Sequence, residues 1–359
     1  MKILMLAPLP PPSGGIASWT VRFRDFCTKN DIALKIINIA MIGKRATVET
    51  LKRNYFDEIW RTKRILSELR RSLSQDEFDV VHINTSCSKF GVLRDAICLA
   101  IIGRKVPSVV HCRCNIEDQL KGKLAKKAFA YLVKKSKAVI VLNRFSKQYV
   151  DAIQPDKAIL IPNFVNDAMI LTDRKINEEV KTIISVGHVE AEKGLYEIVE
   201  TAKRCPQYSF VLVGAIREDI SSLKTPGNVS FSGRKDQEEI QQFLSEADIF
   251  LFPSKTEGFS NALLEAMAKG LPVIASDVGA NKEMIENMGG VLLDKNAPEH
   301  IVEAIEKLLS PQIRKEMSAW NINKVKSSYR MDVVLQQYFE LYKRIMTNRA
   351  EETKQEEMR

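Results

Sequence analysis

Short apolar runs recur along the chain and alternate with longer segments in which apolar residues return at helical spacing. Strands that are buried on both faces of a parallel sheet read as continuous apolar stretches, so these runs predict strands covered by helices. The runs form two series, and each series opens with a strand, a glycine turn and a helix. The first series comprises residues 2–7, 34–39, 80–83, 108–111, 139–142 and 159–161, and the second comprises 182–187, 210–214, 229–233, 249–252, 273–275 and 289–294. This alternation predicts an α/β protein with two similar nucleotide-binding-type domains.

The length of the chain, 359 residues, suits two domains better than one. We expect an N-terminal domain over residues 1–165 and a C-terminal domain over 166–329, because a polar segment at 167–180 separates the two series of runs. A last helix is predicted at about 330–346. The remaining residues, 347–359, are highly charged and almost free of large apolar side chains, so we expect a disordered tail.

The stretch 247–285 organises the second domain, because it predicts strand, loop, helix and strand in quick succession. Its first strand, 249–252, is a short apolar run closed by a proline. The helix that follows, 262–269, carries apolar residues on most faces and ends at Gly270, as helices often end at a glycine. We therefore expect this helix to be largely covered by the rest of the domain.

Two glutamates in this stretch are candidate ligand-binding residues. Ser260 or Asn261 is the expected N-cap, and the free N–H groups of the first turn could hold a phosphate or sugar hydroxyls. Glu257 lies in the preceding loop, and Glu265 lies far enough along the helix to reach a second part of the same ligand. The alternative is that Glu257 is a solvated loop acid and Glu265 a surface residue.

Three other positions lie where open α/β sheets bind ligands, at the carboxyl ends of predicted strands. Gly14 and Gly15 open the first helix, His111 ends the fourth strand, and Lys193 precedes the first helix of the second domain. A lysine at such a junction can neutralise a diphosphate. The alternatives are a tight turn, a structural histidine and a solvated loop lysine. His82, which also lies near a strand end, is assigned to the scaffold.

The formal charge of +9 and the isoelectric point near 9.1 suggest an anionic partner, which could be a phosphate compound, a membrane surface or a nucleic acid. Two segments predicted to be helical, 44–74 and 120–137, carry much of the positive charge. The lysines of the second segment form either a solvated face or a cationic platform for anionic lipid headgroups. No aromatic-basic motif or zinc pattern supports a nucleic-acid partner. The basic residues of the two segments include Lys52, Arg53, Arg61, Lys63, Arg64, Arg70, Arg71, Lys121, Lys123, Lys126, Lys127, Lys134, Lys135 and Lys137.

The six cysteines show no CxxC pair and no spacing typical of a disulfide framework or a zinc loop, although Cys112 and Cys114 lie close to His111. Reduced thiols in a cytoplasmic protein are therefore expected. The N-terminus does not resemble a signal peptide, and no apolar run approaches the ~18 residues of a membrane span. We expect a cytoplasmic protein, and the basic segments are compatible with a place at the inner face of the plasma membrane.

The residues Glu257 and Glu265, in a Glu-x7-Glu pattern followed by Ala-Met-Ala-x-Gly-x-Pro-Val, resemble the signature of the retaining GT-B glycosyltransferases of family 4, also called group 1. The resemblance implies the GT-B fold, in which two Rossmann-like domains with parallel sheets face each other across a cleft. It also implies that the last helix packs back on the first domain. The N-terminal domain would then lie on the acceptor side and the C-terminal domain would bind the nucleotide-sugar donor.

The same resemblance implies roles for individual residues. Glu257 would lie at the donor sugar and its phosphate, Glu265 would bond the nucleotide ribose, and His111 would lie at the catalytic centre. Lys193, followed by glycine, would clamp the diphosphate. His188 stands where the family has an arginine, and a neutral histidine cannot form the bidentate grip of an arginine. The expected catalytic residues are His111, Glu257 and Lys193, and the expected donor-binding residues are Gly14, Gly15, His188, Arg234, Gly258, Phe259, Ser260, Asn261 and Glu265.

Arg234 enters this set as a cation that could compensate for His188. The implied function is a metal-independent hexosyl- or N-acetylhexosaminyl-transfer (EC 2.4), without a cofactor, from a nucleotide-sugar to a saccharide or lipid-linked saccharide acceptor. A UDP-sugar is the expected donor. Surface polysaccharide or glycolipid assembly, with peripheral contact to an anionic membrane, is the expected setting. The alternatives are a catalytically weak nucleotide-sugar-binding partner subunit of a glycosyltransferase complex, favoured by His188, a sugar-nucleotide epimerase of the same fold, and a nucleic-acid-binding protein.

Overall fold

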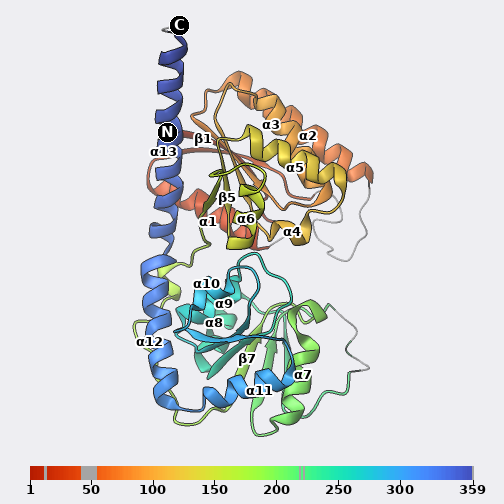
Figure 1. Cartoon of the computed structure of the whole chain (residues 1–359), viewed down its shortest axis with the longest axis vertical. Helices are drawn as coiled ribbons and strands as arrows, with labels where there is room; N and C mark the ends of the chain where they lie inside the picture. Colours follow the sequence, from red (N-terminus) through yellow and green to blue (C-terminus); the bar gives the residue numbers. More distant parts are fainter. Residues whose placement is uncertain (12–13, 42–54, 218–219, 221–222, 358–359) are drawn as a thin grey trace. The chain divides into compact units, whose positions relative to one another are not determined.

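The protein is represented by a computed structural model that describes residues 1–11, 14–41, 55–217, 220 and 223–357 (Figure 1). The chain divides into two compact units. The first unit comprises Met1–Ile161 and Leu335–Arg359, and the second comprises Pro162–Val334. The divisions therefore lie a few residues from the expected positions, 165 and 330.

The first unit is built on a six-stranded, wholly parallel sheet in the order β2-β1-β3-β4-β5-β6. Its strands are β1 (Lys2–Ala7), β2 (Ala33–Asn38), β3 (Val80–Thr85), β4 (Ser108–Cys112), β5 (Ala138–Val141) and β6 (Ala158–Leu160). Its helices are α1 (Gly15–Lys29), α2 (Tyr55–Gln75), α3 (Lys89–Ile102), α4 (Ile116–Gln119), α5 (Lys123–Lys135), α6 (Arg144–Asp151) and most of α13 (Met331–Glu357). The basic segment expected to be helical from residue 44 is described only from Tyr55, so Lys52 and Arg53 lie outside the described residues.

The second unit repeats this plan with a parallel sheet in the order β12-β11-β10-β7-β8-β9. Its strands are β7 (Thr182–Val186), β8 (Ser209–Val213), β9 (Val229–Gly233), β10 (Ile249–Phe252), β11 (Val273–Ser276) and β12 (Gly290–Leu293). Its helices are α7 (Leu195–Arg204), α8 (Gln237–Glu246), α9 (Asn261–Ala268), α10 (Asn281–Ile285), α11 (Pro298–Lys307) and α12 (Pro311–Ser328), with short 3-10 turns η2 (Asp167–Met169) and η3 (Ala191–Lys193). All the predicted strands are confirmed to within one or two residues.

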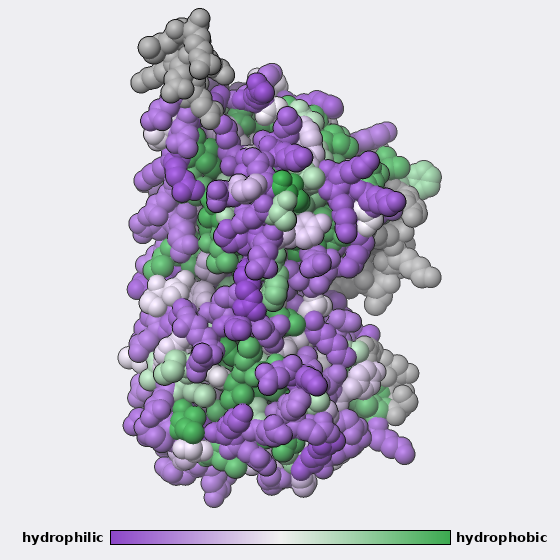
Figure 2. Space-filling model, viewed as in Figure 1, coloured by the Kyte–Doolittle hydropathy of each residue, from purple (hydrophilic) through white to green (hydrophobic). Residues whose placement is uncertain are grey.

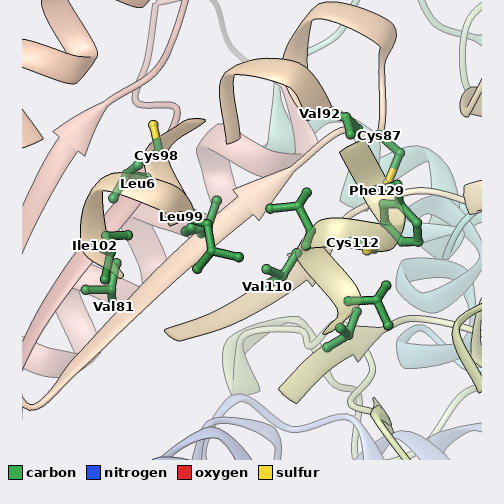
Figure 3. Close-up of a cluster of buried hydrophobic side chains, with 14 of the residues drawn as sticks. Leu6, Val81, Cys87, Val92, Cys98, Leu99, Ile102, Val110, Cys112 and Phe129 are labelled. Carbon is green, nitrogen blue, oxygen red and sulfur yellow. The ribbon is translucent and has the colours of Figure 1, made fainter. Parts of the chain in front are cut away.

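Helices α2, α3 and α5 cover one face of the first sheet (Figure 1). Their inward side chains join those of alternate strand positions in a single apolar cluster, part of which Figure 3 shows. Leu99, Ile102 and Phe129 come from the helices, and Val81 and Val110 come from the strands. Burial on both faces explains why these strands read as unbroken apolar runs in the sequence.

The opposite face of the first sheet packs against α1 and the N-terminal half of α13. Successive strand side chains point to opposite faces, so His82 lies on the side opposite its neighbour Val81. There the His82 Nδ1 atom lies 2.5 Å from the Tyr342 hydroxyl of α13. Phe23 of α1 stacks on Phe339, with ring centroids 5.8 Å apart. The prediction of a last helix near residues 330–346 is therefore confirmed, and that helix completes the core of the first unit.

The disordered tail expected at 347–359 is not what the structure shows, because α13 continues to Glu357. The alanine, glutamate, lysine and glutamine residues of this segment are good helix formers, and high charge alone does not oppose a helix. Arg349 also ties the segment to the first unit, because its Nη2 atom donates to the Lys105 carbonyl oxygen at 2.6 Å.

Each sheet has one position where the strand order reverses. In the first sheet, the chain passes from β1 to its neighbour on one side, β2, and from β3 to its neighbour on the other side, β4. In the second sheet, the same reversal lies between β7, which is followed by β8, and β10, which is followed by β11 on the other side. Loops that leave neighbouring strands in opposite directions leave a crevice at the carboxyl edge, which is where open α/β sheets bind ligands. The strand order therefore places one candidate site in each unit.

Among the described residues, no helix combines the length and the apolar character that crossing a bilayer requires.

The packing of α13 can be tested through Tyr338, which is fully buried and contacts the rings of Trp19 and Phe23. Replacing Tyr338 with alanine leaves a large cavity, and we expect a loss of about 3–5 kcal/mol in the free energy of unfolding, measured by chemical denaturation. Tyr131→Ala, at a 37% exposed position of α5, is the matched control and should cost less than about 1 kcal/mol. Equal losses in the two variants would contradict this role of α13.

Candidate functional site

The strand-order reversal of the second unit brings together two of the predicted catalytic residues. Lys193 ends the loop after β7, and Glu257 lies in the loop after β10. The Lys193 Nζ atom lies 2.5 Å from the Glu257 Oε1 atom, and the Ser254 hydroxyl donates to the same oxygen at 3.0 Å. Both charged side chains remain partly exposed, 24% for the lysine and 13% for the glutamate. The pair therefore lies at the surface of the crevice and remains open to a ligand.

Two glycines allow the loops to pack closely enough to form this pair. Gly194 has φ +80°, and a Cβ atom there would lie 2.6 Å from the Pro253 carbonyl oxygen. Gly279, in the loop after β11, has φ +57°, and its Cβ would lie 2.5 Å from the Glu257 carbonyl oxygen. A side chain at either position would push the loops apart, because both the space and the backbone conformation suit only glycine.

The N-terminus of α9 lies directly after the Glu257 loop. Ser260 is the N-cap residue, as expected, but its hydroxyl does not cap the helix and donates to the Asn281 Oδ1 atom at 2.7 Å. The Asn261 Oδ1 atom accepts from the Asn163 side chain at 2.8 Å. Phe259 is 8% exposed and packs edge-on against Tyr329. Because the cap side chain is used elsewhere, the first-turn N–H groups of α9 are available to an anionic ligand.

Glu265 lies on α9 and is half-buried, although its neighbours on both sides, Leu264 and Ala266, are fully buried. The helix is otherwise covered, as its apolar composition predicted. A half-buried carboxylate on the first two turns of α9 suits a hydrogen bond to a hydroxyl group of a ligand held at the helix N-terminus.

The predicted donor-site residues His188, Lys193 and Arg234 do not all lie at the loop after β7. His188 and Lys193 line one small hollow of this loop. Arg234 is exposed and follows β9, which is the edge strand and is separated from β7 by β8. Arg217 is placed closer, because its backbone N–H donates to the Val189 carbonyl oxygen at 3.1 Å, next to His188. Sequence reasoning missed Arg217, since only the pairing of the loop after β8 with the loop after β7 brings it to this site.

In the first unit, the strand-order reversal coincides with a cavity of about 440 Å³. Gly14 and Gly15 line it at the N-terminus of α1, so the predicted glycine turn does face a ligand-sized space. A Cβ atom on Gly14 would contact nothing within 4 Å, which shows that the backbone there opens directly onto the cavity. The other residues around the cavity are Pro8, Ile16, Ala17, Ile39, Ala40, Met41, Glu58, Arg61, Asn84, Ser86, Ser88, Gly91 and Arg94.

The cavity combines apolar walls with buried polar groups. Asn84 is 1% exposed, and its side-chain amide has no hydrogen-bond partner among the described residues. Arg94 is 6% exposed, and its Nη2 atom donates to the Asp95 Oδ1 atom at 2.7 Å. An amide left without a partner beside a cavity of this size is suited to hydrogen bonding with a polar ligand, because burying it unpaired is unfavourable.

His111, the third predicted catalytic residue, is completely buried in the first unit. Its ring lies 5.4 Å from that of Trp19 and 5.3 Å from that of His82. The Arg113 Nη1 atom donates to the His111 Nε2 atom at 3.2 Å, so the proton of the neutral imidazole belongs on Nδ1. This burial leaves no imidazole surface for direct contact with a sugar in the present conformation.

Arg113 is the residue in this region that reaches the carboxyl edge of β4, and sequence reasoning did not select it. Its guanidinium stacks over the Trp19 ring, 4.6 Å from the ring centroid. Burial lowers the pKa of Arg113 to about 10, so the group remains a cation at neutral pH. The alternation of side chains along β4 was the available signal, because residues 111 and 113 share one side of the strand.

Burial also governs the two histidines. Desolvation lowers the pKa of His82 to about 3, and it lowers the pKa of His111 well below its ordinary value, with the charge of Arg113 adding to both shifts. Both imidazoles are therefore neutral around pH 7. His82 has the scaffold position expected for it.

Cys87, Cys112 and Cys114 lie near this region, but all six cysteines are free. The described residues contain no group of three or more histidine, cysteine or acidic side chains placed to hold a metal ion.

Comparisons with known proteins agree with this architecture. Residues 170–326 match the family model described as glycosyl transferases group 1, and residues 39–168 match the model described as glycosyltransferase family 4. The chain belongs to the group 1 glycosyltransferases of the family 4 type. The resemblance seen in the sequence is thereby confirmed.

This glycosyltransferase is 26% identical over 336 residues to the UDP-Gal:alpha-D-GlcNAc-diphosphoundecaprenol alpha-1,3-galactosyltransferase of Escherichia coli, which covers 84% of each chain. Its fold is similar to that of sucrose-phosphate synthase from Thermosynechococcus elongatus, with a TM-score of 0.78, 14% identity and coverage of 97% of this chain and 100% of the other. The HepE protein of Anabaena, in complex with UDP and glucose, gives a TM-score of 0.72 at 16% identity, over 95% of this chain and 99% of the other. These likenesses confirm the predicted α/β, GT-B fold.

The neutral histidines predict how the stability of this glycosyltransferase depends on pH. The unfolded chain takes up protons on histidine as the pH falls below ~6.5, whereas the folded chain does not until the pH approaches the lowered pKa values. Stability is therefore present above pH 6.5 and is lost as the pH falls, by up to about 1.4 kcal/mol per pH unit for each histidine.

The measurement is the free energy of chemical unfolding between pH 7 and pH 4. We expect His82→Gln to reduce the slope with pH, whatever its effect on stability at pH 7. A slope that is the same in the wild type and in His82→Gln would show that His82 is not held neutral by burial.

Proposed function

We propose that this glycosyltransferase moves a sugar from a UDP-sugar to a hydroxyl group of a saccharide acceptor, with retention of configuration at the anomeric carbon. The observation that carries the proposal is the Lys193–Glu257 pair at the strand-order reversal of the second unit, beside the uncapped N-terminus of α9. The Escherichia coli relative, a galactosyltransferase named for UDP-Gal and a GlcNAc-diphosphoundecaprenol, supports a UDP-sugar as the donor class and a saccharide linked to a lipid diphosphate as the acceptor class.

In this proposal the donor diphosphate lies between Lys193 and the first turn of α9. The lysine supplies a point charge, and the helix N-terminus supplies N–H donors and a partial positive charge. Glu257 holds the lysine before the donor binds and then accepts from hydroxyl groups of the donor sugar. Gly258 and Phe259 bring backbone N–H groups to the same region. Glu265 accepts from the ribose hydroxyls.

Transfer requires the bond between the anomeric carbon and the diphosphate oxygen to break while the acceptor oxygen approaches. The developing charge on the diphosphate is stabilised by the same lysine and helix N-terminus, so the proposal needs neither a metal ion nor a cofactor. We propose a same-face substitution in which the departing diphosphate assists removal of the acceptor proton. This route retains configuration without a covalent sugar–enzyme intermediate.

The acceptor is assigned to the cavity of the first unit. Arg94 and Asn84 offer buried hydrogen-bond donors, and Ile39 and Met41 offer apolar walls, a combination that suits a saccharide. In this scheme His111 is a positioning residue that holds Arg113 at the edge of β4. The class of sugar transferred is a hexose or an N-acetylhexosamine. The setting is surface polysaccharide or glycolipid assembly at the inner face of the plasma membrane, where a lipid-linked acceptor would be reached.

Donor binding is the decisive measurement. Titration calorimetry with UDP-, GDP- and ADP-sugars in the presence of EDTA should show saturable binding of a UDP-sugar, with slow hydrolysis of the donor. Glu265→Ala should weaken binding at least about tenfold, because it removes a charge-assisted hydrogen bond to the ribose. Glu303→Ala, an exposed acid of α11 in the same unit, is the control and should not change binding. Donor binding without turnover on any acceptor would instead favour the partner-subunit alternative, and absence of binding to every donor would contradict the proposal.

The cation that compensates for His188 can be identified separately. The backbone N–H of Arg217 is hydrogen-bonded to Val189, next to His188, which places this arginine at the loop after β7. We therefore expect Arg217→Gln to weaken UDP-sugar binding about fivefold to tenfold, and Arg234→Gln to have a smaller effect. His188→Arg should strengthen binding. Uridine, which lacks the diphosphate, serves as the control ligand, and its affinity should not change in any of the three variants. A larger loss of UDP-sugar affinity in Arg234→Gln than in Arg217→Gln would show that Arg234 is the cation that compensates for His188.

A further inference from the structure

The layer formed by α2, α3 and α5 has an outer face whose charges are of one sign. These helices lie side by side over one face of the first sheet, with α3 in contact with both neighbours (Figure 1). Their acidic side chains, Asp57, Glu58, Glu68 and Asp95, are half-buried or buried. Their exposed charged side chains are all basic: Lys63, Arg64, Arg70, Arg71, Lys89, Lys123, Lys126, Lys127, Lys134 and Lys135.

Large apolar side chains lie among these cations. At the start of α2, Phe56 is 77% exposed, Ile59 is 54% exposed and Trp60 is 70% exposed. Their spacing places them on one stripe of the helix, directly before Lys63 and Arg64. Leu124 on α5, 60% exposed, adds a further apolar position. Single exposed apolar residues are ordinary, but three on adjacent positions of one turn mark an interaction surface.

The two sets of residues together narrow the kind of partner. A solvated face would carry both signs of charge and few aromatic rings. Hydrophilic residues cover most of the surface in the view of Figure 2, so a cluster of large exposed apolar side chains is a departure from the rest of that surface. A surface for nucleic acid would need cations but not a cluster of exposed aliphatic and aromatic groups on one turn. An amphipathic face with basic residues around Trp, Phe and Leu is suited to the interface of an anionic bilayer.

The inner side of the same turn of α2 links this face to the acceptor cavity. Glu58 and Arg61 line the cavity, whereas Phe56, Ile59 and Trp60 on the same turns point away from it into solvent. A bilayer in contact with the outer side would therefore lie one helix width from the cavity. An acceptor anchored in that bilayer by its lipid part could place its saccharide in the cavity without leaving the membrane.

We propose that the outer face of α2, α3 and α5 docks on the surface of an anionic phospholipid bilayer, with Phe56 and Trp60 inserted between the headgroups and the lysines of α5 paired with lipid phosphates. The link to the acceptor rests on the proposed function, but docking itself does not. The sequence indicated only the lysines of α5 as a platform, and the structure adds the aromatic turn of α2 and the absence of exposed acids on the described residues of α2, α3 and α5.

The test is flotation of the full chain with vesicles of phosphatidylglycerol and phosphatidylcholine in equal amounts, and with phosphatidylcholine alone. We expect binding to the anionic vesicles only, weakening as salt is raised. Lys126→Gln/Lys127→Gln/Lys134→Gln/Lys135→Gln should weaken it more than about tenfold, because each basic residue contributes roughly a fivefold gain at such a surface. The matched control, Lys181→Gln/Lys295→Gln/Lys307→Gln/Lys315→Gln, removes the same charge from exposed positions of the second unit and should keep most of the binding.

Insertion is tested by quenching of tryptophan fluorescence with brominated lipids. The chain has three tryptophans: Trp60 is exposed, Trp19 is 4% exposed, and Trp320 is half-buried in the second unit, outside the proposed docking face. Quenching should therefore occur in the wild type and disappear in Trp60→Phe. Phe56→Ala/Trp60→Ala should also lose vesicle binding. Equal loss in the two quadruple variants would show a nonspecific charge effect and overturn the proposal. So would quenching that persists without Trp60, or binding to an oligonucleotide but not to vesicles.

Donor titration of the same variants separates this proposal from the proposed function. All the surface variants should bind the UDP-sugar as the wild type does, since none of the substituted residues lies in the second unit's site. If the wild type binds vesicles but no donor, the docking proposal is supported and the proposed transfer function is wrong. If it binds the donor but no vesicles, only the docking proposal is wrong.

Discussion

The parallel pairing of every strand is the constraint on which the rest of this structure depends. Between two parallel strands the chain must cross back from the carboxyl end of one strand to the amino end of the next. All the carboxyl ends of a parallel sheet therefore lie along one edge. The loops after β7, β10 and β11 therefore meet at one edge, although Lys193 and Glu257 are far apart in the sequence. The reversal of strand order then opens a crevice at that edge, and the same logic places the glycine turn of α1 beside the loop after β3.

Within the second unit, the Lys193–Glu257 pair is held by close backbone packing rather than by its own attraction. Exposed ion pairs contribute little to stability, because solvent screens them and ordering the side chains costs entropy. The geometry depends instead on Gly194 and Gly279, which let the three loops touch. In the proposed function the donor diphosphate replaces the carboxylate at the lysine, and because the glycines hold the loops together, this exchange leaves the packing of the loops in place.

The first unit uses burial in a different way. Trp19, His82, His111 and Tyr338 form a ring cluster between the sheet, α1 and α13, and desolvation keeps both imidazoles neutral. A neutral His111 can accept from Arg113 and so fix a cation at the edge of β4. Tyr338 of the C-terminal helix packs against both histidine rings, so this helix contributes to the burial that keeps them neutral.

The sequence by itself determined the strands, the two-unit plan and the family. Strands that are buried on both faces of a parallel sheet appear in the sequence as unbroken apolar runs, and Glu257 and Glu265 belong to a dense local signature of the family. The sequence also predicted that Gly14, Gly15 and Lys193 lie in strand–helix turns at the carboxyl edges of the sheets, where the structure has them. Only the tertiary structure decided what surrounds each residue. It buried His111, brought Arg113 and Arg217 to the carboxyl edges of their sheets, and used the Ser260 hydroxyl for Asn281. These outcomes depend on contacts between segments distant in the sequence, which no local pattern encodes.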